Sequence, residues 1–313
     1  MKVLIATEKP FNGKAVEAIK KELESQNHCV ELLEKYTSTD ELKEAVKDAE
    51  AMIVRSDKIT KEILDAAPKL KVVVRAGAGY DSIDTAYAKE KGVVVENTPG
   101  QNSNAVAELV FGLLIYMSRS CFSGKSGCEL KGKKLGILAF GNIGRHVARI
   151  ANGFGMEVYG FSRSHAENPK KEDGVQFVAT KEELFKQCDI VSVHLPSNEH
   201  TKQSVGYDVV NLMKKGGILV NTARKEVINE PELLRLMGER EDLKFVTDIK
   251  PDADAEFAKF EGRYFTTPKK MGAQTAEANA NAGIAAAQQI NAYFKDGCKI
   301  GRASCRERVC YSV

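Results

Sequence analysis

The chain has 313 residues, 43% of them hydrophobic, and contains no apolar run long enough to cross a bilayer. This length is typical of two domains, each large enough to bury a core of its own. The net charge of +3 arises within residues 299–313, so the rest of the chain is neutral and lacks the basic surface of a nucleic-acid or anionic-membrane binder.

Short apolar, β-branched segments alternate with helical patterns along most of the sequence. The first segment is closed by Glu8, too early for the apolar part of a signal peptide. The expected strands span residues 3–6, 29–33, 51–55, 71–75 and 93–96 and then, after a long helix, 134–139, 157–161, 189–194, 217–221 and 244–248. Strands separated by helices form βαβ units, which predict parallel sheets with helices on both faces.

The two sets of strands predict two domains, separated by residues 98–100 and a helix at 104–120. A last helix, residues 276–294, follows the second set and is expected to pack on the first. We therefore predict an α/β protein with two Rossmann-like, doubly wound parallel-sheet domains. A discontinuous substrate domain, residues 1–99 and 271–298, is expected to surround an inserted dinucleotide-binding domain, residues 100–270.

Residues 299–313 differ abruptly in composition from the rest and lack apolar periodicity. Their first part, KIGRASCRERV, is what results when a sequencing adapter is translated, so we predict a non-native, dispensable tail. Two of the seven cysteines lie there, and the other five are scattered without CxxC spacing. This usage predicts reduced thiols in the cytoplasm rather than a disulfide framework or a metal site. The five are Cys29, Cys121, Cys128, Cys188 and Cys298.

A glycine loop at residues 136–145 is the candidate site for cofactor phosphates. It resembles a GxGxxG loop between a strand and a helix, with Ala139 in place of the first glycine. Gly141 would let the backbone approach a pyrophosphate, and Gly144 would allow close packing of helix and strand. The expected cofactor contacts are Gly141, Asn142, Ile143 and Gly144, at the positive end of the helix dipole.

The next strand ends where dinucleotide enzymes usually place an acid against the ribose 2′-hydroxyl. Here the strand runs into Ser162 and Arg163, and no carboxylate occupies the position. An arginine beside serines is suited to a 2′-phosphate, although a solvated loop with an incidental arginine would look the same. The sequence therefore predicts a nicotinamide cofactor and leaves NAD and NADP open.

Three further segments resemble the D-isomer-specific 2-hydroxyacid dehydrogenase family, and the likeness covers nearly all of residues 1–298. They are DIVSVHLP at 189–196, VNTAR at 220–224, and the run from NTP at 97–99 to VAE at 106–108. The resemblance implies hydride transfer between a nicotinamide cofactor, NAD by preference, and a small D-2-hydroxy acid. It also implies a homodimer through the helix at 104–120.

The same resemblance assigns roles to single residues. His194, Pro196 and Thr222 are expected along the cofactor, and Arg224 is expected to bind the substrate carboxylate. Lys225 departs from the family, which has glycine there.

Within the family, the segments IVRS at 53–56 and VRAGAGYD at 74–81 look like the branch that acts on D-3-phosphoglycerate. Guanidinium groups and glycine-loop amides suit a phosphate or carboxylate, although Arg55 can also be read as a surface charge at a strand end. No ACT-type regulatory domain is expected after the last helix. The expected substrate contacts are Arg55, Ser56, Arg75, Ala76, Gly77 and Asn102, with Arg224.

The family takes its proton carrier from a histidine in a TPHLGAST-like segment, but residues 267–275 read TPKKMGAQT. Counting from either end of the segment puts Lys269 or Lys270 at the site, and one branch of the family is known to use lysine. Asp248 matches the family aspartate that ends its strand. The usual glutamate falls at Ala253, so Asp252 or Asp254 is a candidate to replace it, although both can also belong to a solvated acidic loop.

Two other functions remain open from the sequence. One is an NADPH-dependent glyoxylate or hydroxypyruvate reductase, suggested by Arg163. The other, from a different class, is a dinucleotide-sensing corepressor, which the neutral charge and the missing interaction tails disfavour.

Overall fold

The computed structural model describes residues 1–166 and 173–296. The described residues divide into two compact units, the first formed by residues 1–102 and 274–296 and the second by residues 103–166 and 173–273. Each boundary lies three residues after the predicted one. The predicted non-native tail lies outside the described residues. No helix in the described part of the chain is long and apolar enough to span a membrane.

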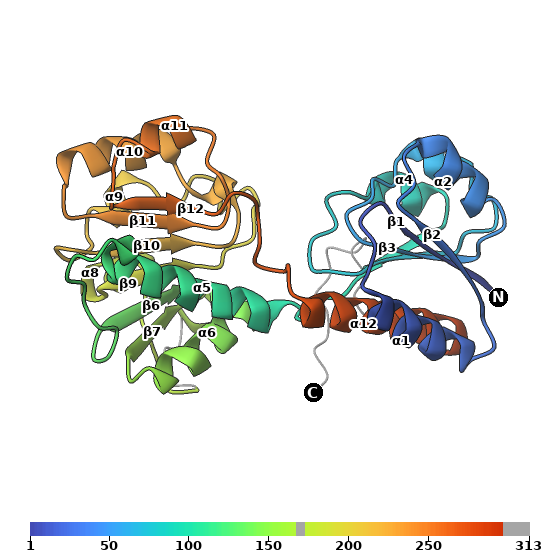
Figure 1. The fold of residues 1–313 in the computed structure, drawn as a ribbon, viewed down its shortest axis with the longest axis horizontal. Coiled ribbons are helices and arrows are strands. Elements are labelled where there is room, and N and C mark those ends of the chain that lie inside the picture. Colours follow the sequence, from blue (N-terminus) through green and yellow to red (C-terminus); the bar gives the residue numbers. More distant parts are fainter. Residues whose placement is uncertain (167–172, 297–313) are drawn as a thin grey trace. The chain divides into compact units, whose positions relative to one another are not determined.

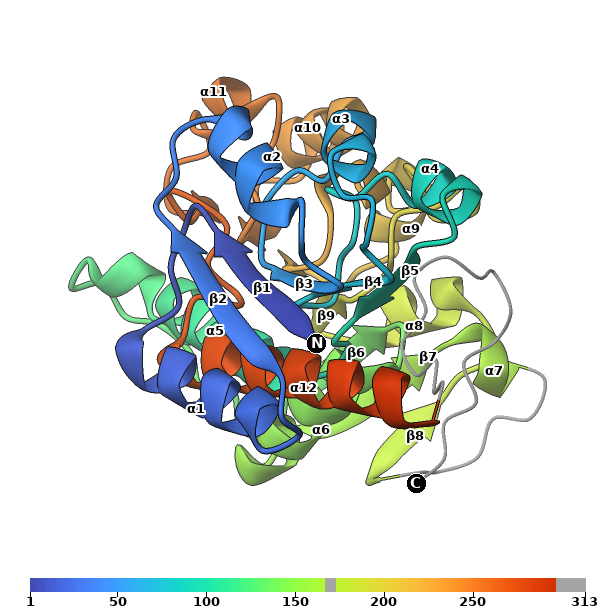
Figure 2. The ribbon, with the colours of Figure 1, turned by 90° about the vertical axis from the view of Figure 1, so that its right-hand side faces the viewer.

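The first unit is a five-stranded parallel sheet covered by helices (Figures 1 and 2). Its strands are β1 (Lys2–Thr7), β2 (Cys29–Glu34), β3 (Ala51–Val54), β4 (Val72–Arg75) and β5 (Val94–Asn97), in the order β2-β1-β3-β4-β5. Its helices are α1 (Gly13–Glu24), α2 (Thr39–Val46), α3 (Lys61–Asp65), α4 (Thr85–Glu90) and α12 (Ala276–Asp296). As predicted, the last helix packs on this unit, where α12 lies beside α1.

Continuous apolar strands arise because both faces of this sheet are buried. Val3 and Ile5 of β1 join the core under α1 and α12, whereas the intervening Leu4 and Ala6 join the core on the opposite face. Successive side chains of a strand point to opposite faces, so a strand buried on both has no polar alternation.

The second unit is a seven-stranded parallel sheet in the order β12-β11-β10-β9-β6-β7-β8 (Figure 1). Its strands are β6 (Lys134–Leu138), β7 (Glu157–Phe161), β8 (Val175–Phe177), β9 (Ile190–Val193), β10 (Ile218–Asn221), β11 (Lys244–Thr247) and β12 (Tyr264–Thr266). Its α-helices are α5 (Ser103–Ser118), α6 (Asn142–Gly153), α7 (Arg163–Ala166), α8 (Lys181–Gln187), α9 (Tyr207–Val210), α10 (Glu230–Glu239) and α11 (Asp254–Phe257). Short 3₁₀ turns occur at Ser120–Phe122 and Lys225–Val227.

All ten predicted strands are present, which confirms the predicted fold class of two parallel-sheet α/β units. Two strands, β8 and β12, were not predicted, and they lie one at each edge of the second sheet. Each has only three residues, too few for an apolar run to stand out from the flanking loops.

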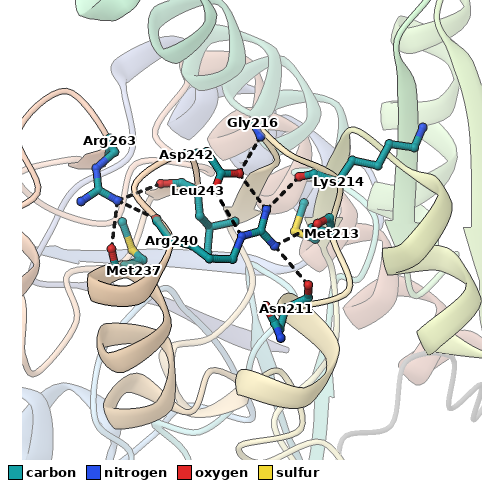
Figure 3. A network of polar contacts seen from close by, with 9 residues as sticks. All are labelled: Asn211, Met213, Lys214, Gly216, Met237, Arg240, Asp242, Leu243 and Arg263. Carbon is teal, nitrogen blue, oxygen red and sulfur yellow. Dashed lines mark hydrogen bonds and ion pairs between the residues drawn. The ribbon is translucent and has the colours of Figure 1, made fainter.

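A polar network joins loops of the second unit, as Figure 3 shows. The Arg240 guanidinium donates to the carbonyls of Asn211, Met213 and Lys214 and forms an ion pair with Asp242. Asp242 also accepts a hydrogen bond from the Gly216 amide. Gly216 and Asp242 lie just before β10 and β11, so the network joins the two loops that enter these strands.

The Asp242–Arg240 pair predicts an acid-sensitive part of the stability. Hydrogen bonds from Arg240 lower the pKa of the Asp242 carboxyl from 3.8 to about 2. Because the folded-state pKa is depressed, the contribution is complete above pH 4 and is lost as the pH falls through 2, and it amounts to about 2 kcal/mol. Urea unfolding of Asp242→Asn should show this deficit at pH 7 and roughly half of it at pH 3. A deficit that is the same at both pH values would contradict the assignment.

Candidate active site

Four neighbouring strands of the second unit bring their carboxyl ends to one edge of the sheet. β11, β10, β9 and β6 are adjacent and parallel. The chain order reverses between β9 and β6, and such a switch point is where open α/β sheets bind their ligands. Most of the residues predicted for the cofactor and for catalysis follow these four strands.

The glycine loop after β6 has the geometry of a phosphate cradle. Gly141 is the N-cap of α6 and supplies no side-chain cap, which leaves the first-turn amides to an external acceptor. No atom lies within 4 Å of a Cβ built on Gly141, whereas a Cβ on Gly144 would lie 2.8 Å from the Ala139 carbonyl oxygen. Ala139, in place of the first glycine, has φ of 78°, a left-handed conformation that costs a non-glycine residue on the order of 1 kcal/mol.

Two buried polar atoms at the same edge have no protein partner within the described residues. They are Nδ1 of His194, just after β9, and Oγ1 of Thr222, just after β10. His194 Nε2 lies 2.9 Å from Ser192 Oγ, and burial lowers the pKa of His194 to about 4, which leaves the ring neutral. Orphaned polar groups beside an open glycine loop fit a bound dinucleotide, which would supply the missing partners.

The other predicted cofactor residues surround this edge. Asn142 and Ile143 begin α6, Pro196 lies in the loop after His194, and Ser162 and Arg163 follow β7. Their contacts with a cofactor remain predictions.

Arg224 is held by a turn that follows β10. The buried Asn221 side chain accepts a hydrogen bond from the Ala223 amide and donates one to the Arg224 carbonyl. Asn221 was not among the predicted site residues, although it lies inside the VNTAR segment. An amide side chain can brace a turn from both sides because it carries a donor and an acceptor.

One of the two candidate lysines lies beside Arg224. Lys270 Nζ donates to the Ala223 carbonyl oxygen at 3.1 Å, and Arg224 Nη1 donates to the same oxygen at 2.9 Å. The two cationic nitrogens are therefore at most 6.0 Å apart, the sum of these distances. The Lys269 side chain is exposed, and no contact of its ammonium occurs in the described residues.

Asp248 binds the segment that carries both lysines through several hydrogen bonds. Its fully buried carboxylate accepts hydrogen bonds from the amides of Met271 at 2.7 Å and Gly272 at 2.8 Å. Thr267 Oγ1 donates to the same carboxylate at 2.9 Å. The family aspartate thus holds the lysine segment at both ends. Thr267 was also missed, because a threonine gives no signal until its partner, 19 residues away in sequence, is known.

Asp252 has a different partner from the one expected of it. Its exposed carboxylate pairs with Lys225 at 2.5 Å. No contact joins it to Lys269 or Lys270 within the described part of the chain. Its charge is balanced by the residue that replaces the family glycine, so Asp248 is the predicted acid that contacts the lysine segment.

In the first unit, Arg55 makes structural contacts. Its guanidinium donates to the carbonyls of Lys9 and Pro10 at 2.7 and 2.8 Å and to Asn279 of α12 at 2.6 Å. It also lies over the Phe11 ring. Three of the five guanidinium donors are thus engaged, and a role of Arg55 in phosphate binding stays a prediction.

The loop after β4 carries hydrogen-bond donors that could bind an anion. The Arg75 guanidinium lies against Gly77, where a built Cβ would be 1.8 Å from Nη1, and Gly77 has φ of 155°. The amides of Ala78, Gly79 and Tyr80 donate to no acceptor in the described residues. An arginine beside unpaired amides is suited to a carboxylate or phosphate. Of the other predicted contacts, Ser56 is exposed after β3, Ala76 is buried in this loop, and Asn102 is half-buried before α5.

The hydrogen bonds between Asp248 and the lysine segment predict that Asp248→Asn loses both stability and activity. The amide nitrogen of asparagine cannot accept the hydrogen bond that one carboxylate oxygen now receives, which should cost about 2–3 kcal/mol and loosen the lysine segment. We expect faster hydrogen exchange at Met271 and Gly272 and a fall in kcat of roughly 10-fold or more.

Asp254→Asn is the matched control, because Asp254 contacts Tyr264 and Lys250 and not the lysine segment. This variant should lose stability without the loss of kcat. Equal kcat in both variants would contradict the role of Asp248 in holding the lysine segment in place.

Comparison with known proteins identifies the family. Residues 116–267 match the family described as "D-isomer specific 2-hydroxyacid dehydrogenase, NAD binding domain". The chain is 35% identical to hydroxypyruvate reductase of Thermotoga maritima over 280 residues, covering 83% of this chain and 90% of that protein. It is 35% identical to D-3-phosphoglycerate dehydrogenase of Methanocaldococcus jannaschii over 268 residues, 80% of this chain and 51% of that longer protein.

A solved structure agrees with these matches. The NAD⁺-bound 3-phosphoglycerate dehydrogenase of Entamoeba histolytica superposes with a TM-score of 0.86 at 44% identity, covering 97% of this chain and 98% of that one. The chain therefore belongs to the D-isomer specific 2-hydroxyacid dehydrogenase family and is an NAD-dependent dehydrogenase, with the NAD-binding domain of that family in its second unit.

Proposed function

We propose that this protein oxidises D-3-phosphoglycerate to 3-phosphohydroxypyruvate with NAD, the reaction that begins serine biosynthesis. The observation that carries the chemistry is the shared Ala223 carbonyl, which keeps the Lys270 ammonium beside the Arg224 guanidinium. A carboxylate anchor and a proton carrier at this separation suit a 2-hydroxy acid, whose carboxylate and C2 hydroxyl are on neighbouring carbons.

The residues divide the reaction between them. Arg224 binds the substrate carboxylate with two parallel hydrogen bonds and so orients C2. Lys270 in its neutral form accepts the proton of the C2 hydroxyl, and the carbonyl forms as the C2 hydrogen leaves with its electron pair. When bound, the nicotinamide ring accepts that hydride. In the reverse direction the protonated Lys270 returns the proton to the carbonyl oxygen.

The preference for a phosphorylated substrate is supported by the first unit. The loop after β4 carries Arg75 and three backbone amides that have no acceptor among the described residues, a donor set suited to an anionic group. The 44% identity to the Entamoeba histolytica 3-phosphoglycerate dehydrogenase favours the same substrate class.

Reduction of hydroxypyruvate or glyoxylate is the second candidate. One observation favours it: most of the Arg55 donors, predicted to bind phosphate, are bonded to Lys9, Pro10 and Asn279. The Thermotoga maritima relative is named a hydroxypyruvate reductase.

A substrate panel separates the candidates. We expect kcat/KM with NADH to be at least about 100-fold higher for 3-phosphohydroxypyruvate than for hydroxypyruvate or glyoxylate, and the converse ranking would establish the second candidate. Arg55→Ala and Arg75→Ala then locate the phosphate donor. A lost charge-assisted contact of about 1.5–3 kcal/mol would raise KM 10- to 100-fold for the phosphorylated substrate alone. An equal effect on all substrates would exclude that arginine as the donor.

We also propose a homodimer through α5. The turn after this helix exposes 66% of Phe122, which packs edge-on against Tyr116 of α5. Light scattering should give twice the chain mass, and Phe122→Asp should lower it toward the monomer.

A further inference from the structure

The first unit has a switch point of its own, to which the proposed reaction assigns no ligand. In the order β2-β1-β3-β4-β5 the chain order reverses between β1 and β3, and open α/β sheets bind ligands beyond the carboxyl ends of their strands at such a point. The helix after β1, however, already has an internal acceptor. Its N-cap Asn12 accepts a hydrogen bond from the Ala15 amide at 2.8 Å, whereas Gly141, the N-cap of α6, has no side chain to do so.

A buried carboxylate joins the loops at this switch point. Asp57, which is 2% exposed, accepts hydrogen bonds from the Glu8 amide, after β1, at 2.7 Å and from the Arg55 amide, after β3, at 2.9 Å. The hydroxyl of Tyr36, after β2, donates to the same carboxylate at 2.8 Å. Backbone amides of loops at the carboxyl ends of two adjacent strands are donors that a bound phosphate would use. The Asp57 side chain takes the place of such an anion.

The Arg55 backbone links Asp57 to the loop after β4. The Arg55 amide donates to Asp57, and the Arg55 carbonyl accepts a hydrogen bond from Nε of Arg75 at 2.7 Å. A shift of the Arg55 backbone therefore moves the acceptor that holds the Arg75 side chain. The Arg75 guanidinium lies against Gly77, which precedes the three amides at residues 78–80 that have no acceptor among the described residues. The position of Arg75 within this donor set thus depends on Asp57.

We propose that Asp57 is a positioning residue for the substrate phosphate. Its carboxylate fills the place of a ligand at the switch point between β1 and β3 and, through the Arg55 backbone, holds Arg75 in the loop that receives the phosphate. This role rests on the proposed function, because it concerns the phosphate of D-3-phosphoglycerate. An arginine that is held in place before binding loses less conformational entropy when the ligand arrives. The benefit is therefore specific to the phosphorylated substrate.

Asp57→Ala removes the acceptor of both backbone amides and should release Arg75. We expect KM for 3-phosphohydroxypyruvate to rise about 10-fold, while KM for hydroxypyruvate and kcat with both substrates stay within about 2-fold of the wild type. In an Arg75→Ala background the same change should leave KM unaltered, because the residue through which Asp57 acts is already gone.

Tyr36→Phe is the matched control. It removes the hydroxyl that donates to the same carboxylate and leaves both amide contacts of Asp57 in place. This variant should have a lower Tm than the wild type, with both KM values unchanged.

Hydrogen exchange of the wild-type enzyme tests the same role without relying on a variant that folds. The exchange rates are compared with NADH alone and with NADH plus 3-phosphoglycerate, two reduced compounds that cannot react with each other. The amides of residues 78–80 should exchange more slowly when 3-phosphoglycerate is added. The amides of Glu8 and Arg55 should be slow and equal in both samples, because Asp57 already binds them.

Three results would overturn the role of Asp57. They are slower exchange of the Glu8 and Arg55 amides on addition of 3-phosphoglycerate, wild-type KM values in Asp57→Ala, and an equal rise of KM for both substrates. In each case the wild type would still prefer 3-phosphohydroxypyruvate. Failure of the proposed function would appear in the wild type itself, as a higher kcat/KM for hydroxypyruvate.

Discussion

Lys270→Met is expected to lower kcat for hydroxy-acid oxidation by about 100-fold or more, because the proton acceptor at the C2 hydroxyl is removed. Lys269→Met should lower this kcat only slightly. Only Lys270 shares the Ala223 carbonyl with Arg224, and the two variants remove the same charge from adjacent positions of one segment. Steady-state kinetics with saturating cofactor, together with cofactor binding by calorimetry, separates the loss of kcat from a loss of cofactor affinity.

The pH dependence gives a second readout. An unperturbed lysine loses its proton near pH 10.4, so oxidation should be favoured by alkaline pH while reduction stays efficient near neutrality. Lys270→His should recover part of the activity and move the pH profile of oxidation toward the ordinary histidine range near 6.5. Near-normal kcat in both Met variants and in their double variant would rule out a lysine as the proton carrier.

Arg224→Gln is expected to reduce kcat/KM for every 2-hydroxy acid by roughly 100- to 1000-fold. Two charge-assisted hydrogen bonds to the carboxylate, worth about 3–5 kcal/mol together, would be replaced by one neutral contact. Arg224→Lys should recover little, because an ammonium cannot donate two parallel hydrogen bonds to one carboxylate. Added guanidinium ion should partly restore the kcat/KM of Arg224→Ala, because the free ion can donate the two parallel hydrogen bonds that the missing side chain supplied.

The control for this series is Arg235→Gln, which removes an exposed guanidinium of the same unit that pairs with Glu239 of its own helix. It should keep wild-type kinetics. A fall in kcat/KM of less than about 3-fold in Arg224→Gln would contradict the role of Arg224 as the carboxylate anchor.

The fold could be predicted well from local patterns. Buried parallel strands such as β1 and β4 have an unbroken apolar run, at residues 3–6 and 72–74, and this run marks them without any knowledge of their neighbours. The edge strands β8 and β12 were missed because three residues carry too little pattern. The close packing expected at Gly144 also has a local cause, since a Cβ built there would lie 2.8 Å from the carbonyl oxygen of Ala139, a near neighbour in the sequence.

By itself, the sequence determined the two parallel sheets, the glycine loop after β6 and the family motifs around Arg224, since each depends on residues close together in the chain. Only the tertiary structure decided which lysine lies beside Arg224, that Asp252 pairs with Lys225, and that Arg55 is bonded to Lys9, Pro10 and Asn279. Each of these contacts joins residues between 27 and 224 positions apart. A side chain's partner depends on which distant backbone segment the fold brings to it, and composition and spacing carry no record of that.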